Sequence, residues 1–434
     1  MLDAAYSTNL TQRDLEAATY SKVSWRLIPF LFLCYVFAYL DRVNVGFAKL
    51  QMLADLKFSE TIYGLGAGIF FIGYFLMEVP SNLALHRFGA RKWIARIMIS
   101  WGVISASMIF VTTPTMFYIL RFLLGVAEAG FFPGIILYLT YWYPASRRSK
   151  ITALFMTGIP IAGVVGGPLS GWILQRFNNV NGMPGWQWLF LLEALPSLVT
   201  GVVTFFYLTD KISDAKWLTT EEKAILEKSL ASESGNIEVH DAGGAFKSAR
   251  VWVLSACYFG IIMGLYGISF WLPSLIKASG VTNALDIGLL TMIPYGFAAV
   301  AMVLIGRSSD RSKERRWHVA IPAVVGAIGL IISTFVPHQP ALAVMALTVA
   351  TVGILGALCQ FWSIPPSFLA GAAAAAGIAL INSVGNLAGF VSPYVVGWIK
   401  DATHSTDIGL YCIACSLVIA ALIVLTIPKS VVNH

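Results

Sequence analysis

Long apolar stretches dominate the sequence and recur along its whole length. Twelve of them reach about 20 residues, which is the length of helix that crosses roughly 30 Å of hydrocarbon. They lie near 23–46, 61–82, 93–112, 115–140, 151–174, 186–208, 250–272, 284–305, 317–336, 341–362, 368–398 and 408–427. Charged residues make up 12% of the chain, about half of the share typical of soluble domains. We therefore expect an all-α polytopic membrane protein with twelve transmembrane helices.

The basic residues are distributed unevenly among the connections. With both termini in the cytoplasm, 22 of the 29 Lys and Arg residues fall on the cytoplasmic side. The five on the outer side are Lys49, Lys57, Arg176, Lys277 and Lys400. Cytoplasmic loops of membrane proteins carry such an excess, so we expect a multi-pass protein of the inner (plasma) membrane with both termini in the cytoplasm. Short basic clusters between apolar spans fit a lipid bilayer as partner and not a nucleic acid.

One long polar connection divides the chain into two halves of six spans each. The predicted parts are an N-terminal six-helix bundle, a cytoplasmic central loop and a C-terminal six-helix bundle, at 1–208, 209–249 and 250–434. Within the loop, Thr219 is followed three residues later by Glu222. This is the spacing of a capping box, so a short cytoplasmic helix is expected to begin there.

The two halves repeat one another in sequence. NLALHRFGARK (82–92) follows the second span, and GRSSDRSKERR (306–316) follows the eighth. The fifth and eleventh spans end similarly, in GGPLSGWI (166–173) and VSPYVVGWI (391–399). Two parallel six-helix repeats are typical of transporters that rock around a site near the middle of the bilayer, at the interface between the repeats.

Four charged residues lie inside spans of the first half. Asp41 and Arg42 are in the first span, and Arg121 and Glu128 are in the fourth. A charge at the bilayer centre costs roughly 2.5–3.5 kcal/mol on insertion scales, so such residues usually pair or line a wet cavity and carry function. Arg121 and Glu128 are two helical turns apart and share a face, and the depths of the two spans allow one network of all four. The alternative is a structural charge cluster that holds the two spans together.

Several stretches carry a family resemblance. GRSSDRSKERR resembles the cytoplasmic signature of the major facilitator superfamily, while its copy has Asn82 and His86 where the signature has Gly and Asp. Five further stretches resemble the anion–cation symporter branch: YLDRVNVGFA, EVPSNL, RFLLGVAEAGFFPG, YWYPASRR and GAAAAAGIALINSVGNLAGFVSPYVVGWIKD. The resemblance covers nearly the whole chain and implies the major facilitator fold. That branch includes proton-driven transporters of tartrate, phthalate, hydroxyphenylacetate, nicotinate and sugar acids.

The resemblance also implies further substrate-binding residues. Tyr39 and Tyr74 match substrate-lining tyrosines of sugar-acid members, and Trp362 and Asn382 match pocket side chains of the second half. A Tyr or Trp in a membrane span is more often a packing residue or an interface anchor. Both interpretations therefore stay open for these aromatic residues.

Other charges near the ends of spans predict gating contacts. Glu78 lies close to the cytoplasmic end of the second span, and Asp310 and Arg311 begin the loop after the eighth. We expect Glu78, Asp310 and Arg311 to take part in salt bridges that stabilise a gate. Glu193, one to two turns into the sixth span, has no assigned role beyond a structural polar contact.

The arginines and the carboxylates inside the membrane suggest two different roles in binding. Arg42 and Arg121 are predicted to bind a carboxylate, and Asp41 and Glu128 to take up protons. An anion that competes for the arginines makes protonation of the carboxylates easier, so anion and proton favour each other's binding. We predict a proton-coupled symporter that imports a small organic carboxylate by alternating access.

The alternatives are an exporter or anion exchanger on the same fold, and an integral-membrane enzyme. The six histidines are scattered, which argues against an enzyme and against a metal site. We expect a monomer that needs no cofactor and is driven by the proton gradient. Hydroxy, dicarboxylic and aromatic acids all remain open as substrates.

Overall fold

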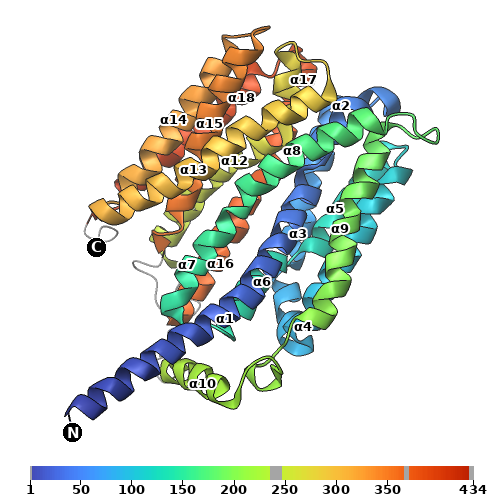
Figure 1. Cartoon of the computed structure of the whole chain (residues 1–434). Coiled ribbons are helices and arrows are strands. Elements are labelled where there is room, and N and C mark those ends of the chain that lie inside the picture. The colour runs from blue at the N-terminus through green and yellow to red at the C-terminus, as the bar shows by residue number, and fades with distance from the viewer. Residues whose placement is uncertain (1, 235–246, 366–370, 430–434) are drawn as a thin grey trace.

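The computed structural model describes residues 2–234, 247–365 and 371–429, and these residues are almost entirely helical (Figure 1). Twelve helices or helix pairs in the described part are long and apolar enough to cross a membrane. They are Asp14–Leu56, Glu60–Phe88, Ala90–Phe110, Pro114–Thr140, Leu154–Arg176, Gly185–Tyr207, Ala249–Ala278, Ala284–Ser312, Arg316–Thr334, Pro340–Phe361, Ala376–Thr403 and Asp407–Thr426. The prediction of an all-α chain with twelve spans is confirmed. The start of the predicted eleventh span, 368–370, lies outside the described residues.

The helices of the first half and of the central loop follow the chain in order. They are α1 (Leu2–Val43), α2 (Val45–Leu56), α3 (Glu60–Phe88), α4 (Ala90–Ser107), η1 (Met108–Phe110), α5 (Pro114–Glu128), α6 (Phe131–Thr140), α7 (Ala145–Met156), α8 (Gly158–Arg176), α9 (Gly185–Tyr207), η2 (Ile212–Asp214) and α10 (Thr220–Ser234). Those of the second half are α12 (Ala249–Ala278), α13 (Ala284–Ser312), α14 (Arg316–Thr334), α15 (Pro340–Phe361), α16 (Gly371–Asn386), α17 (Ala388–Thr403) and α18 (Asp407–Thr426).

Several spans are interrupted within their length. α1 and α2 are separated at Asn44, α5 and α6 at Ala129 and Gly130, and α16 and α17 at Leu387. Gly130 has φ +83°, and a Cβ there would lie 2.4 Å from the Ser81 hydroxyl, so the break requires glycine. Interrupted helices at membrane depth are tolerated where protein buries them, and in transporters they build binding sites. The breaks place the ends of α1 and α5 deep inside the protein.

The two halves meet along pairs of closely packed helices. α8 packs along α13, α17 along α3, and α12 against α2. A Cβ on Gly167 of α8 would lie 2.7 Å from the carbonyl of Gly288 on α13, and one on Gly64 of α3 would lie 2.4 Å from the carbonyl of Pro393 on α17. Small residues allow such backbone contact between membrane helices. The domain boundaries at 1–208, 209–249 and 250–434 stay a prediction.

Helix α10 packs against α1, near the end of the bundle that carries the N-terminus (Figure 1). Its predicted capping box is confirmed. The Thr219 hydroxyl accepts the N–H of Glu222 at 3.2 Å, and the Glu222 carboxylate accepts the N–H of Thr219 at 2.8 Å. Lys22 of α1 donates to the same carboxylate at 2.8 Å. Helix α10 is thus attached to the first span, while residues 235–246 of the loop lie outside the described part.

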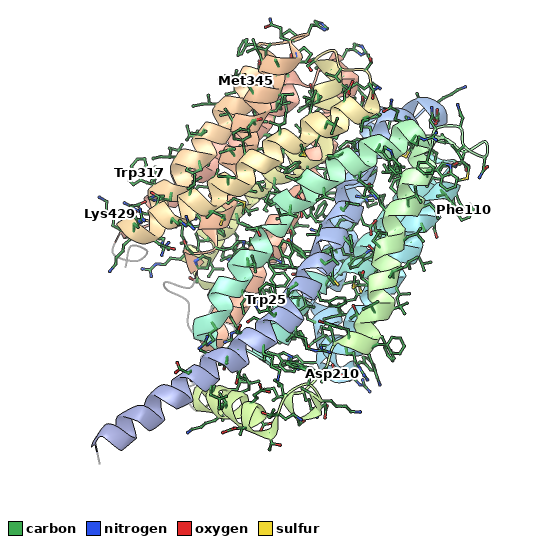
Figure 2. All side chains as sticks on the ribbon, in the orientation of Figure 1. Trp25, Phe110, Asp210, Trp317, Met345 and Lys429 are labelled. Atoms are coloured by element: carbon green, nitrogen blue, oxygen red, sulfur yellow. The ribbon has the colours of Figure 1, made fainter. Side chains whose placement is uncertain are left out.

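Apolar side chains face outward along the length of the bundle, as a lipid environment requires. Trp25 and Trp317 are exposed toward the α10 end, and Phe110 is exposed toward the opposite end (Figure 2). Aromatic side chains favour the two membrane–water interfaces. Their positions therefore indicate the borders of the hydrocarbon layer.

Candidate functional site

A buried ion pair joins the ends of α1 and α5. Arg42, in the last turn of α1, donates through Nε to Glu128, the last residue of α5, at 3.1 Å, and its Nη2 contacts the same oxygen. The Nη1 of Arg42 donates to the hydroxyl of Tyr266 on α12 at 3.0 Å. Glu128 is 1% exposed and Arg42 is 9% exposed. One guanidinium therefore links two spans of the first half to the second half.

Arg121 lies two turns before Glu128 on α5 and is fully buried. It donates through Nε to the carbonyl of Gly66 at 3.2 Å, and through Nη2 to those of Ala67 and Arg42 at 3.3 and 3.4 Å. Its Nη1 has no hydrogen-bond partner among the described residues. Carbonyls offer only partial negative charge to a full positive charge, and a buried charge needs a counter-charge and hydrogen bonds. Arg121 thus keeps donor capacity that an anion could use.

Asp41 does not join this network, in contrast to the sequence-based expectation. It accepts hydrogen bonds from Trp101 Nε1 at 2.9 Å, Ser105 Oγ at 3.2 Å and Ser197 Oγ at 2.5 Å. Consecutive residues of an α-helix point about 100° apart, as 3.6 residues per turn requires. Asp41 therefore faces α4 and α9, while Arg42 faces α5 and α12.

Aromatic rings surround the Arg42 guanidinium, and two of them were expected from the sequence. Its Cζ lies 5.9 Å from the ring centroid of Tyr39 and 5.4 Å from those of Tyr74 and Phe70. The hydroxyls of Tyr39 and Ser269 of α12 share a hydrogen bond of 2.9 Å. Tyrosine faces attract a cation, so these rings stabilise the arginine from one side and leave its N–H edge for oxygen acceptors.

Glu78 contacts the second half by hydrogen bonds and not by the predicted salt bridge. Its carboxylate accepts from Asn382 Nδ2 at 2.8 Å and from Ser383 Oγ at 3.4 Å, both on α16. These two hydrogen bonds direct the carboxylate to α16, and no cation pairs with it among the described residues. Asn382, expected among the substrate-binding residues, is occupied by this contact. Trp362 packs against Tyr258, with ring centroids 4.9 Å apart.

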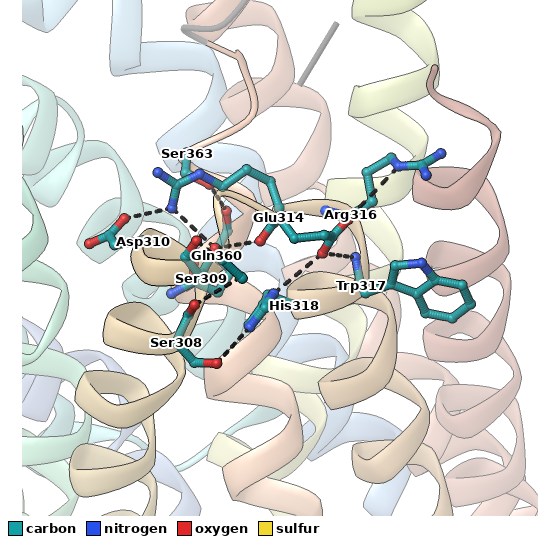
Figure 3. Close-up of polar contacts among 11 residues, drawn as sticks. Ser308, Ser309, Asp310, Glu314, Arg316, Trp317, His318, Gln360 and Ser363 are labelled. Carbon is teal, nitrogen blue, oxygen red and sulfur yellow. Dashed lines mark hydrogen bonds and ion pairs between the residues drawn. The ribbon is translucent and has the colours of Figure 1, made fainter. Parts of the chain in front are cut away.

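The signature segment, at the end of α13 and in the loop after it, is stabilised by contacts among its own residues (Figure 3). Arg315 donates to Asp310 at 2.7 Å and to Ser309 Oγ at 3.1 Å. Arg311, which was expected to take part in a gating salt bridge, is exposed. Glu314 accepts the N–H of Arg316 at 3.1 Å and so caps the start of α14. The salt bridge of Asp310 is thus made with a residue of the same segment, and the gating role expected for Asp310 and Arg311 stays a prediction.

The first copy of the signature obtains its carboxylate from elsewhere in the chain. His86 stands where the signature has an acid, and Asp210, three residues beyond α9, takes over part of that role. Its carboxylate accepts the N–H of Arg91 at 2.8 Å and lies 3.9 Å from Arg91 Nε. Asp210 therefore caps the N-terminus of α4, where a negative charge is favourable.

A cluster of charges at the end of the bundle opposite α10 was not predicted. Glu60, the first residue of α3, pairs with Lys49 of α2 at 2.6 Å and with Lys400 of α17 at 2.5 Å. Asp401 accepts the first two N–H groups of α3 at 3.1 and 2.7 Å. The Lys49 ammonium lies 3.4 Å from the ring centroid of Trp271 on α12. We name these five residues the Glu60 cluster; it joins both halves at this end. Within the described residues, no group of three or more His, Cys, Asp or Glu side chains could hold a metal ion.

A twelve-span bundle with a buried arginine–glutamate pair that contacts the other half has the architecture of a membrane transporter. The family model of the Major Facilitator Superfamily matches residues 31–393. The chain belongs to this superfamily. It is a multi-pass membrane protein that transports a small molecule and is not an enzyme.

Several proteins resemble the chain along almost its whole length. One relative is a Pseudomonas putida protein provisionally named metabolite transport protein NicT. It is 50% identical to this chain, and the match covers 96% of each chain. An Agrobacterium vitis protein with the provisional name tartrate transporter is 50% identical, covering 96% of this chain and 93% of its own. A quinolone resistance transporter of Acinetobacter baumannii is 43% identical over 92% of each. Among solved structures, an inward-facing bacterial homologue of the human lysosomal transporter Spinster shares the fold, with TM-score 0.72, 16% identity and coverage of 92% and 96%.

Proposed function

We propose that this transporter imports a small organic carboxylate together with protons by alternating access. The observation that carries the proposal is the Arg42 guanidinium, which bonds at once to Glu128 and to Tyr266 of the other half. A ligand that competes with Glu128 for this guanidinium changes contacts on both sides of the interface. The rocking motion is thus coupled to occupancy of the site.

The substrate anion is proposed to bind between Arg42 and Arg121. Arg121 contributes a buried N–H without a partner, and two guanidinium groups suit one bidentate carboxylate or two separate ones. Tyr39 and Tyr74 lie around the same guanidinium and supply hydroxyls or ring faces for the rest of the ligand. The relative provisionally named a tartrate transporter makes tartrate the first acid to test.

Proton coupling follows from the exchange of partners at Arg42. When the substrate carboxylate occupies the guanidinium, Glu128 loses its counter-charge while it remains buried. An unpaired buried carboxylate is strongly unfavourable, so Glu128 takes up a proton. Binding of anion and proton is then mutually favourable, and linkage makes this effect reciprocal.

The proposed orientation places α10 and both termini in the cytoplasm, in the inner membrane of the cell. Most Lys and Arg residues then lie on the cytoplasmic side, as the positive-inside rule requires. Both arginines of the proposed site come from one chain, so the unit of transport is proposed to be a monomer, driven by the proton gradient without a cofactor.

The test is uptake into proteoliposomes of a panel of labelled acids: tartrate, phthalate, hydroxyphenylacetate, nicotinate and a sugar acid. At least one should accumulate when the lumen is made alkaline, and a protonophore should abolish the accumulation. Glu128→Gln should still exchange labelled acid across the membrane but not concentrate it. Glu16→Gln is the matched control. It alters an ion pair with Arg147 in which each side chain is about 40% exposed. Equal accumulation by Glu128→Gln would refute the coupling role.

An organic anion exporter or exchanger is the second candidate. The 43% identical relative named a quinolone resistance transporter favours it, because resistance requires the drug to leave the cell. Counterflow that is independent of pH would support an exchanger. Proton-driven accumulation only in inverted vesicles would support an exporter.

A further inference from the structure

A second buried carboxyl lies outside the Arg42–Glu128 pair. Glu193 of α9 is 1% exposed. Its Oε1 accepts the hydroxyl of Ser170 on α8 at 2.6 Å, and its Oε2 is buried. Next to it lies the buried side-chain amide of Asn44, between α1 and α2, which interacts with this carboxyl but makes no hydrogen bond of ordinary length among the described residues. This arrangement leaves both an oxygen and an amide with unused hydrogen-bonding capacity.

The neighbouring Asp41 shows what a buried carboxylate needs here. Asp41 receives three donors, from Trp101, Ser105 and Ser197, whereas Glu193 receives one hydroxyl. Three donors suit an ionised carboxylate, because it can only accept hydrogen bonds. Glu193 accepts a hydrogen bond at one oxygen and has no partner at the other among the described residues. This arrangement suits the protonated form, which can also donate. Asp41 lies near Glu193, because Ser197, one turn after Glu193 on α9, donates to Asp41. Two neighbouring buried carboxylates repel each other, so one of them is favoured in the protonated form.

The charged groups around Glu193 are few. Asp41 is the titratable group that faces it from α1, while Ser170 of α8 is neutral. Asp55 of α2 is bound to Trp186, two turns away along α9. No cation forms an ion pair with Glu193 among the described residues. A charged Glu193 would therefore be buried without a counter-charge, which is costly.

A small cavity lies beside the two polar neighbours of this carboxyl. About 20 Å³ of space lies between α1, α8, α12 and α13, lined among others by Asn44, Ser170, Tyr39, Ser269 and Tyr295. This is enough for about one water molecule. The cavity touches both polar neighbours of Glu193, Asn44 and Ser170, and it lies between the two halves. Motion of the halves would open and close it.

We propose that Glu193, Asn44 and Ser170 form a proton-binding site separate from the Arg42–Glu128 pair. A proton arriving through cavity water binds Oε2 of Glu193, and the new O–H donates to the amide oxygen of Asn44. On release the proton returns to water in the same cavity. The role of this site in coupling rests on the proposed symport. The protonation of the site does not depend on it. The site supplies a second proton for each transported anion.

Infrared spectroscopy of the full-length transporter in nanodiscs tests the site directly. A protonated carboxyl has a carbonyl band separate from those of carboxylates. The wild-type spectrum should contain such a band at neutral pH, and Glu193→Gln should lack it. Glu128→Gln should retain it. Ser170→Ala should shift the band, because the hydroxyl no longer bonds to Oε1. Spectra of wild type and Glu193→Gln that agree in this region overturn the proposal.

Transport stoichiometry tests the role in coupling. With the first panel acid that wild type accumulates, the reversal potential in proteoliposomes gives the protons carried per anion. Glu193→Gln should lower that number by one and keep the affinity for the acid within about twofold. An unchanged number overturns the coupling role. If wild-type uptake ignores the proton gradient, the proposed symport fails, while the infrared band still decides whether Glu193 holds a proton.

Discussion

Lys400 of α17 and Glu60 of α3 form an ion pair of 2.5 Å that joins the two halves at the end opposite α10. The chain separates these residues by 340 positions. Lys49 shares the same carboxylate and is almost completely buried. The proposed alternating access separates the halves at one end at a time, so we predict that the Glu60 cluster stabilises the closed state of this end.

Glu60→Gln should favour opening of this end. The substitution removes the carboxylate that the two ammonium groups share, and unsatisfied buried polar groups cost about 1–3 kcal/mol, which corresponds to roughly fivefold to 150-fold in the equilibrium. Distances between spin labels on α3 and α17 at this end should lengthen. Arg176→Gln, an exposed basic residue at the same end, should leave the distances unchanged. Equal distance distributions in both variants would show that the cluster does not control closure.

Arg42→Lys should impair transport although it keeps the positive charge. A lysine ammonium cannot reproduce the fixed fork of a guanidinium, so it cannot bond to Glu128 and Tyr266 at the same time. We expect at least tenfold weaker uptake of the transported acid. Tyr266→Phe removes one hydrogen bond, worth about 0.5–1.5 kcal/mol, and should have a smaller effect. Uptake kinetics of both variants against wild type check this order, and a more damaging Tyr266→Phe would contradict it.

The twelve spans could be predicted because span length and hydropathy are local properties of a membrane chain. The depths of two antiparallel spans allowed Arg42 and Glu128 to lie in one network, and the structure brings these two side chains together. The direction of Asp41 could not be predicted, because it depends on which helices pack beside α1. The contacts of Asp210 with Arg91 and of Glu60 with Lys400 were also missed. Their partners lie 119 and 340 residues apart, and one sequence carries no signal that pairs them.

Gly130→Ala should destabilise the protein by more than its backbone conformation alone explains. A left-handed φ costs a non-glycine residue roughly 1–2 kcal/mol, and a Cβ at this position also collides with the Ser81 side chain at 2.4 Å. Gly182 is the matched control, since it has φ +73° and nothing within 4 Å of a built Cβ. The melting temperature in detergent should fall further for Gly130→Ala than for Gly182→Ala. Equal decreases would mean that the Ser81 contact gives way freely.

Acid should release α10 from the first span. The hydrogen bond from Lys22 holds the pKa of Glu222 below its ordinary value, which is about 4.3 for an unperturbed Glu. A carboxyl whose pKa is lower in the folded state stabilises that state fully above its unfolded pKa, and the contribution is lost as the pH falls through the folded pKa. Hydrogen exchange of the α10 amides, corrected for intrinsic rates, should therefore accelerate below about pH 4. Glu222→Gln should exchange faster already at neutral pH and show no further acid step. A wild-type profile that matches the variant at every pH would contradict the role of the Lys22–Glu222 pair in docking α10.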